Sequence, residues 1–319
     1  MPMIRLLFYI LMTIRNWLYD CGLFSCYKSK IPIISIGNIT VGGTGKTPFV
    51  IYLIKKVLMK GLNPLIISRG YKRTSKGLVF FNGNFLKKSK VKADYVGDEP
   101  FLISKKFPNI DIIINKSRAK AVQYAECLDN KYDVIILDDA FQHRSLHRDL
   151  DIVLINTNQN HSGLLPRGLL REPFQNISRA DCVVLTKNNP KFDASILDFF
   201  KNPIFKCQEN YSLSSNKNEG VGFCGVGNPT SFWKTLEGLS VRISKKIEFK
   251  DHQEYTCSEI NSIESLLTNQ TTFFTTEKDW VKLPEDFISK HDGVFVNMDV
   301  DIEDSSFDQI INKTCQLQQ

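Results

Sequence analysis

The sequence predicts an α/β fold in which helices connect the strands of a mainly parallel sheet. Short runs rich in Ile, Val and Leu alternate with helical stretches, and parallel strands require such crossover connections. Strands are expected at residues 31–36, 64–68, 134–137, 151–155 and 182–186. An inserted β-hairpin is expected at residues 77–85, where Val and Phe residues surround an Asn-Gly pair that favours tight turns.

The length of the chain predicts a second domain. A chain of 319 residues is longer than one typical core accommodates. The polar segment 211–220 is the best candidate for a boundary and for a hinge, and strands of a smaller α/β domain are expected at residues 221–226, 272–275 and 294–298. The expected units are an N-terminal helix at 1–25, a first domain at 26–212 and a second domain at 220–319.

Composition and charge exclude several classes of protein. A hydrophobic content of 42% with 24% charged residues is typical of a globular protein. The eight cysteines include no C-x-x-C pair, so neither a zinc site nor a disulfide framework is indicated, and a reducing cytosol fits best. Part of the net charge of +7 lies in basic clusters at 87–92 and 144–148, which lack the interleaved aromatic residues that stack on nucleic-acid bases.

The N-terminal segment is apolar but short. Its uninterrupted apolar run, residues 6–12, falls far short of the ~20 residues that span a bilayer. Arg15 also interrupts the pattern of a secretory signal. We expect a helix at the membrane surface, with Arg5 and Arg15 at the lipid headgroups and Trp17 and Tyr19 as aromatic anchors. The alternative is a helix packed on its own domain.

A Gly-rich turn joins the first expected strand to a helix expected at 49–58. This order is that of a phosphate-binding loop, in which glycine N–H groups bind phosphate oxygens, Lys46 reaches the outer phosphates and Thr47 binds Mg²⁺. The first domain is therefore expected to be P-loop NTPase-like. Thr40 departs from the usual pattern, which has Gly at this position. The residues expected to bind ATP or GTP are Thr40, Val41, Gly42, Gly43, Thr44, Gly45, Lys46 and Thr47.

Two acidic pairs and one histidine are candidates for chemistry. Asp138 and Asp139 end an apolar run, which suits Mg²⁺-binding acids at the carboxyl edge of a parallel sheet. Asp98 and Glu99 lie in a tight turn where a general base or a metal ligand would face the nucleotide, although both also suit a helix start. His252 would pair with a carboxylate across a cleft, but a lone histidine is more often structural.

Eight short motifs occur in the order seen in the tetraacyldisaccharide 4'-kinase family, the lipid A 4'-kinases, which the chain resembles as far as about Leu283. The motifs are residues 40–48, 68–71, 97–100, 138–143, 165–173, 225–229, 251–252 and 276–279. The resemblance implies transfer of the γ-phosphate of ATP, with Mg²⁺, to the 4'-hydroxyl of a tetraacyl glucosamine disaccharide 1-phosphate, forming lipid IVA. It also implies two α/β domains with the active site in their cleft and a membrane-associated N-terminal helix.

The resemblance assigns roles to individual residues. Lys46 would stabilise charge on the transferring phosphoryl group, and Asp98 would be the base, oriented by His252. The expected metal site contains Thr47, Asp138, Asp139 and Glu99. The residues expected to contact the substrate are Arg171, Glu172, Gln142 and His143. The positions that depart from the family pattern near the acceptor are Arg167, Leu169 and Gln253.

An alternative function is a membrane-associated ATPase switch with a deviant P-loop. Such ATPases carry a signature Lys where this chain has Val41, and they lack the turns at 97–100 and 170–173. A third interpretation, a membrane-surface binding module, assigns no function to Asp98. For the kinase, the expected partners are a lipid A disaccharide precursor and a membrane lipid surface, without nucleic acid. The protein is expected to be a monomer and to be a peripheral protein of the cytoplasmic face of the inner membrane.

Overall fold

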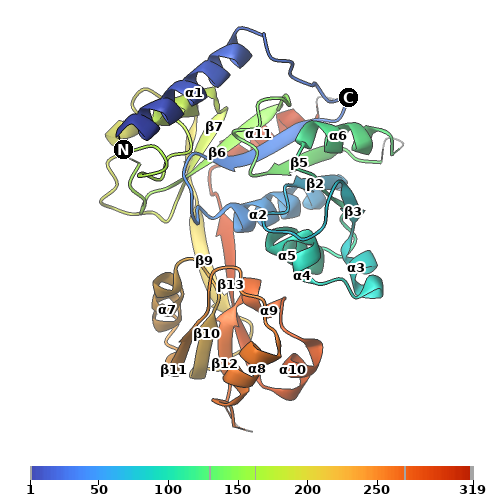
Figure 1. The fold of residues 1–319 in the computed structure, drawn as a ribbon, viewed down its shortest axis with the longest axis vertical. Coiled ribbons are helices and arrows are strands. Elements are labelled where there is room, and N and C mark those ends of the chain that lie inside the picture. Colours follow the sequence, from blue (N-terminus) through green and yellow to red (C-terminus); the bar gives the residue numbers. More distant parts are fainter. Residues whose placement is uncertain (1, 129–130, 162, 269–270, 317–319) are drawn as a thin grey trace.

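The computed structural model describes residues 2–128, 131–161, 163–268 and 271–316, except for the side chains of residues 2–5, which include Arg5. Figure 1 shows two α/β parts stacked along the long axis, with the N-terminal helix on the outside of the first part. The first part contains an eight-stranded sheet of order β3-β4-β2-β5-β1-β6-β7-β8. Its strands are β1 (Ile33–Asn38), β2 (Pro64–Ser68), β3 (Val79–Phe81), β4 (Ile112–Ile114), β5 (Val134–Asp138), β6 (Leu150–Asn156), β7 (Cys182–Thr186) and β8 (Ile204–Lys206).

Strand β1 lies in the interior of this sheet and pairs in parallel with β5 and β6. All six of its residues are buried. Ile34 packs in the same apolar cluster as Phe49, whereas Ile33 packs with Ala121 in a second cluster. Successive side chains of a strand point to opposite faces of the sheet. The continuous apolar run at this position therefore reflects burial on both faces.

Helices and short 3₁₀ turns cover and connect the strands of the first part. The α-helices are α2 (Lys46–Met59), α3 (Gly83–Ser89), α4 (Ala93–Val96), α5 (Asp98–Lys106) and α6 (Arg118–Glu126). The 3₁₀ turns are η1 (Phe174–Arg179) and η2 (Ala194–Leu197). Two of these helices, α2 and α5, begin at motifs that the sequence analysis identifies.

The second part contains a five-stranded sheet of order β11-β10-β12-β13-β9, in which only β9 runs antiparallel to its neighbour. Its strands are β9 (Gln208–Leu213), β10 (Glu219–Cys224), β11 (Arg242–Glu248), β12 (Phe273–Thr276) and β13 (Gly293–Asp301). Its helices are α7 (Pro229–Gly238), α8 (Cys257–Glu264), α9 (Glu277–Trp280) and α10 (Glu285–Lys290). The α/β class expected for both parts is confirmed.

The β-hairpin expected at residues 77–85 is wrong. Residues 77–89, all of which the structure describes, form the single strand β3 followed by α3. Strand β3 pairs antiparallel with β4. The Asn82 side chain accepts a hydrogen bond from the backbone N–H of Phe85 at 3.0 Å, so the Asn-Gly pair starts a helix instead of a turn between strands.

The boundary expected at residues 211–220 differs from the point where the chain passes from the first sheet to the second. The chain leaves the first sheet after β8 and enters the second at β9, so residues 208–212 belong to the second sheet although they were assigned to the first domain. The last helix, α11 (Ser305–Cys315), returns to the first part, where Phe307 packs against Phe49 and Phe205. Strands β9 and β13 lie side by side where the two parts join (Figure 1).

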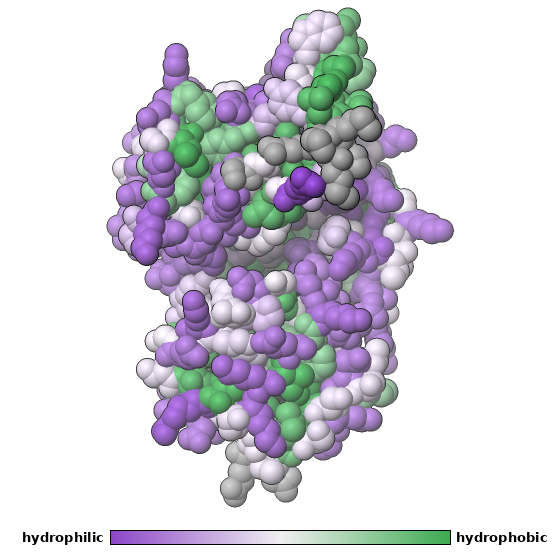
Figure 2. All heavy atoms as spheres, turned by 60° about the vertical axis from the view of Figure 1, so that its left-hand side comes forward, coloured by the Kyte–Doolittle hydropathy of each residue, from purple (hydrophilic) through white to green (hydrophobic). Residues whose placement is uncertain are grey.

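Helix α1 (Pro2–Asp20) exposes most of its large apolar side chains, including Leu6, which is 58% exposed, and Trp17. Figure 2 shows apolar side chains at the projecting upper end of the molecule, where α1 lies. Asn16 is the buried exception and faces the first part. Among the described residues, none of the helices has the length and apolar character that crossing a membrane requires.

Candidate active site

Residues 40–45 form the loop between β1 and α2, and Gly42 and Gly45 give it its shape. Their φ angles are 100° and 79°, in the left-handed region that glycine adopts without steric cost. Gly45 is also the N-cap of α2, so the loop leads directly into the first turn of that helix. The positive end of the helix dipole and the free N–H groups of this turn make an anion-binding site.

Side chains from three neighbouring strands of the sheet form hydrogen bonds with the loop. Asn38 of β1 donates a hydrogen bond to Oγ1 of Thr44 at 2.9 Å. Asn156 of β6 donates to the carbonyl of Gly43 at 2.8 Å, and Thr186 of β7 donates to the carbonyl of Thr44 at 3.2 Å. Because these carbonyls are engaged with the sheet, the loop conformation is held without a ligand.

Thr40, the residue that departs from the usual loop pattern, is buried. Its hydroxyl donates to Oε1 of Gln159 at 2.7 Å, and the next residue, Val41, donates from its N–H to the carbonyl of Leu169 at 2.8 Å. These contacts join the phosphate-binding loop to the turn that carries Arg171. Gln159 has no motif around it, so sequence reasoning missed its part in supporting the loop.

Two carboxylates at the end of β5 face Lys46 and Arg171. The Nζ atom of Lys46 lies 3.5 Å from Oδ1 of Asp139, and Nη1 of Arg171 lies 2.8 Å from the same atom. Asp138 is buried and accepts a hydrogen bond from the Ser68 hydroxyl at 3.1 Å. The structure thus brings the loop lysine, both acids and the Arg171 turn into one site.

The two adjacent acids have opposite pKa shifts. Burial and the neighbouring charge of Asp139 raise the pKa of Asp138 to about 6. Burial also acts to raise the pKa of Asp139, but the charges of Lys46 and Arg171 outweigh it and leave that pKa below its ordinary value. A cation beside Asp138 would therefore stabilise its ionised form.

The residues at this edge fit a Mg²⁺ ion. Mg²⁺ is usually held by one or two carboxylates, together with substrate phosphates and water, and seldom by a complete protein cage. The described residues include no group of three or more His, Cys, Asp or Glu side chains arranged to hold a metal. A divalent cation would offset the burial that raises the pKa of Asp138. Asp139 and Thr47 carry the other side-chain oxygens that the sequence predicts for this site.

Asp98 and His252 meet across the two parts of the fold. Asp98 begins α5 and is only 8% exposed. His252 lies in the loop after β11 with a φ of 63°, and its Nδ1 lies 2.8 Å from Oδ2 of Asp98. The ring of Tyr71 packs edge-on against the imidazole, with centroids 5.6 Å apart. The structure therefore brings together the acid and the histidine that the resemblance pairs.

Positive charge keeps Asp98 ionised. Burial acts to raise the pKa of Asp98, but the hydrogen bond with His252 and the charges of Lys282 and Lys278 outweigh it, so the pKa lies below its ordinary value. Glu99 has a different environment: Lys278 donates a hydrogen bond to its carboxylate at 2.9 Å. The carboxylate expected to bind metal at Glu99 is thus engaged by a lysine of the second part.

Glu172 lies in the interior, only 2% exposed. Its carboxylate accepts hydrogen bonds from Asn176 at 2.8 Å, Arg179 at 2.9 Å, and Asn16 and Gln142 at 3.1 Å. This burial argues against the direct substrate contact that the sequence analysis expected for Glu172. Its contacts instead dock α1 onto the first part and fix the Gln142 side chain.

His143 is half-buried, and its ring is held by the backbone of the neighbouring segment. Its Nε2 lies 3.2 Å from the backbone N–H of Arg118, which donates to it. Burial, together with the charges of Arg118, Arg148 and Arg15, lowers the pKa of His143 to about 4. The imidazole is therefore neutral near pH 7 and acts as an acceptor within the protein. Of the four expected substrate residues, Arg171, Gln142 and His143 are partly exposed, and the first two lie at the edge of the acidic pair, where Arg171 donates to both Asp139 and Gln142.

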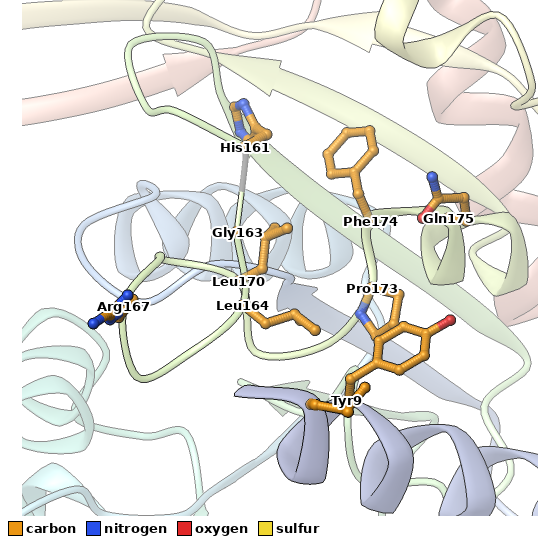
Figure 3. Close-up of a pocket in the computed structure, with 10 residues that line it drawn as sticks. Tyr9, His161, Gly163, Leu164, Arg167, Leu170, Pro173, Phe174 and Gln175 are labelled. Atoms are coloured by element: carbon orange, nitrogen blue, oxygen red, sulfur yellow. The ribbon is translucent and has the colours of Figure 1, made fainter. Parts of the chain in front are cut away.

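A cavity of about 530 Å³ lies between α1 and residues on both sides of Arg171, from His161 to Gln175. Figure 3 shows Tyr9 of α1 beside Pro173, with Arg167 at the far end of the lining. Leu170 lines the cavity and also pairs through its backbone with Thr40. The cavity therefore adjoins the phosphate-binding loop on the side of the N-terminal helix.

The strand, loop and helix at residues 33–59, with two acids at the end of the neighbouring parallel strand, define an α/β nucleotide-binding protein of the P-loop class. A family model described as tetraacyldisaccharide-1-P 4'-kinase matches residues 1–316. Tetraacyldisaccharide 4'-kinase of Aquifex aeolicus is 38% identical over 285 residues, which cover 84% of each chain. The chain belongs to the tetraacyldisaccharide 4'-kinase family.

Other relatives agree in sequence and in structure. Tetraacyldisaccharide 4'-kinase of Chlorobium phaeobacteroides is 36% identical over 305 residues, covering 87% of this chain and 84% of the relative. The crystal structure of LpxK from Aquifex aeolicus in complex with ATP superposes with a TM-score of 0.83 at 32% identity, covering 98% of this chain and 97% of the other. The two-part architecture is thus shared with a solved member of the family.

Proposed function

We propose that the protein transfers the γ-phosphate of ATP to the 4'-hydroxyl of tetraacyldisaccharide 1-phosphate, forming lipid IVA for lipid A biosynthesis. Membership of the family supports this choice of phosphate acceptor and reaction. The observation that carries the reaction type is the buried, ionised Asp98 held by His252. An ionised carboxylate in this position can accept the proton of an acceptor hydroxyl.

The chain's own residues divide the work of phosphoryl transfer. The loop N–H groups and Lys46 bind the phosphates and stabilise the charge on the transferring group. Asp98 accepts the proton of the acceptor hydroxyl as the new P–O bond forms and the bond between the γ-phosphorus and the β-phosphate oxygen breaks, releasing ADP. His252 orients the carboxylate of Asp98. General-base catalysis typically contributes about 10²- to 10⁴-fold, while alignment and charge stabilisation contribute more.

Thr47, Asp138 and Asp139 would hold Mg²⁺, directly or through water, with Glu99 as a further candidate if it exchanges its partner Lys278. The bound ion would neutralise negative charge on the phosphates. Independently of the ion, Asp139 holds Lys46 and Arg171 at the edge of the site. Arg171 and Gln142 are our candidates for contact with the acceptor.

We further propose that the monomer rests on the cytoplasmic face of the inner membrane through α1. Burying one large apolar side chain is worth roughly 1.5 to 3 kcal/mol, whereas an Arg near an anionic leaflet adds about 1 kcal/mol. Detergent should therefore release the protein from membranes more effectively than salt. Leu11→Asp should weaken binding to vesicles, and Met59→Asp, at an exposed position of α2, is the matched control. Equal binding of both variants would contradict the anchor.

The reaction is tested with detergent-solubilised protein, γ-labelled ATP, Mg²⁺ and tetraacyldisaccharide 1-phosphate, with the lipids separated by thin-layer chromatography. Label in a 4'-phosphorylated lipid, absent with Lys46→Ala, is the expected result. Release of free phosphate regardless of the acceptor would overturn the proposal and favour the ATPase switch.

A further inference from the structure

Lys282 contacts the proposed base but belongs to none of the residues to which the chemistry above assigns a role. Its side chain is only 5% exposed, which is unusual for a lysine. The Nζ atom lies 3.5 Å from Oδ2 of Asp98 and 3.2 Å from Oδ1 of Asp279, and it donates to the carbonyl of Gln253 at 3.0 Å. This buried cation therefore joins an acid of the first part to an acid of the second.

The contacts of Lys282 close a ring that returns to Asp98. Oδ2 of Asp279 accepts a hydrogen bond from the N–H of Gly225 at 2.9 Å. The carbonyl of Gly225 accepts from the N–H of His252 at 3.2 Å, and the His252 ring meets Asp98 at 2.8 Å. Lys282 thus links Asp98 to Asp279, and Asp279 in turn holds, through Gly225, the backbone of His252.

His252 needs such support because its φ of 63° is a left-handed conformation that is strained for a non-glycine residue. Surrounding contacts must hold the backbone in place for the ring to face Asp98. Asp279 is completely buried and is also fixed by the Thr276 hydroxyl, which donates to it at 2.7 Å. The motif at residues 276–279 therefore supplies a rigid anchor for Lys282.

We propose that Lys282 is a positioning residue for phosphoryl transfer, which acts by fixing the carboxylate of Asp98 against His252. The inference rests on the proposed function, because it deepens the role of the same base. Its competitor is an ordinary ion pair that only joins the two parts. Lys106 of α5 provides that case, because it forms a 2.7 Å ion pair with Glu277, the first residue of α9, whereas Lys282 lies in the turn after that helix.

The test compares Lys282→Met with Lys106→Met, since each removes one interdomain cation but only the first contacts Asp98. Lys282→Met should lower kcat by up to about 100-fold, the effect of a small misplacement of a catalytic group, with the KM for ATP unchanged. Lys106→Met should keep kcat. Lys282→Arg should recover part of the loss, and Lys282→Met should have no further effect in an Asp98→Ala background.

Equal losses of kcat in the two methionine variants, or a further loss in the Asp98→Ala background, would overturn the proposal. If Lys282→Met fails to fold, Asp279→Asn weakens the same ring from its other side and should produce the same selective loss of kcat.

A readout without turnover separates this inference from the proposed function. The imidazole ¹⁵N signals of His252, identified by their loss in His252→Gln, report its hydrogen bond with Asp98. We expect them to change in Lys282→Met and to stay unchanged in Lys106→Met. If wild-type protein phosphorylates no lipid, the proposed function fails. If the signals do not respond to Lys282→Met, the positioning role fails.

Discussion

The Nδ1 atom of His252 lies 2.8 Å from Oδ2 of Asp98, although the two residues are 154 positions apart and belong to different parts of the fold. Asp98 is fixed by the first turn of α5, and His252 by the loop after β11. The pair can therefore form only when the two parts lie together. Any motion that separates them would disassemble the proposed base.

Replacement of Asp98 by Asn should lower kcat by about 10²- to 10⁴-fold, because the base is lost while the side-chain shape is kept. His252→Gln should cause a smaller loss, since the carboxylate remains. Steady-state kinetics at saturating ATP and lipid measure both effects. Glu254→Gln, a change at a nearby exposed acid, is the control. Near-full turnover by Asp98→Asn would exclude Asp98 as the base.

Lys46→Ala should be at least as damaging as the loss of Asp98, because Lys46 stabilises charge on the phosphates throughout the transfer. The same kinetic assay, together with ATP binding by calorimetry, measures the effect. Lys55→Ala on the exposed face of α2 is the matched control, since it removes only a surface ion pair with Asp299. Activity of Lys46→Ala within tenfold of wild type would contradict the role of the loop lysine.

Glu172→Gln should destabilise the protein by up to about 3 kcal/mol, because it leaves Arg179 without its charged partner in a largely buried place. Chemical denaturation measures the loss. Glu237→Gln, which removes an exposed partner of Lys246, should change stability little. If Glu172 contacts substrate instead, its variant should keep wild-type stability and show a raised KM for the lipid.

Gly37→Ala should cost about 1 to 3 kcal/mol of stability through overpacking. A Cβ atom at Gly37 would lie 2.5 Å from Cβ of Phe141, in a region where both backbones are fixed by the sheet and the following turn. Gly238→Ala, in open space at the end of α7, is the control and should be neutral or slightly stabilising. Thermal unfolding of the two variants distinguishes the outcomes.

His143 should make the stability fall as the pH falls from about 6.5 towards 4. Its pKa is about 4 in the folded protein and has the ordinary value of about 6.5 in the unfolded chain, so only the unfolded chain binds this proton in that window. The loss is at most about 3.5 kcal/mol, since the shift is about 2.5 pKa units and each unit is worth about 1.4 kcal/mol. His143→Gln should reduce the pH dependence of the melting temperature over this range. His147→Gln, at a more exposed histidine, should leave that pH dependence unchanged.

Local patterns were sufficient for five strands of the first sheet (β1, β2, β5, β6 and β7) and for the phosphate-binding loop, whereas β4 and β8 were not expected. Strands β2 and β7 have the bounds expected from their apolar runs, because strands buried on both faces carry a continuous apolar signal. The prediction of a β-hairpin at the Asn-Gly pair, residues 82–83, was wrong because the local signal there is ambiguous. That signal suits both a hairpin turn and a helix start, and the pairing of β3 with β4 decided between them.

The sequence by itself was enough to identify the α/β class, the loop with Lys46 and Thr47, and the ordered motifs of the family, because these depend on residues adjacent in the chain. Only the tertiary structure decided that Glu172 is buried, that Glu99 is paired with Lys278 and that Lys282 joins Asp98 to Asp279. Burial and ion pairing depend on which distant segments pack together, and no local pattern carries that information.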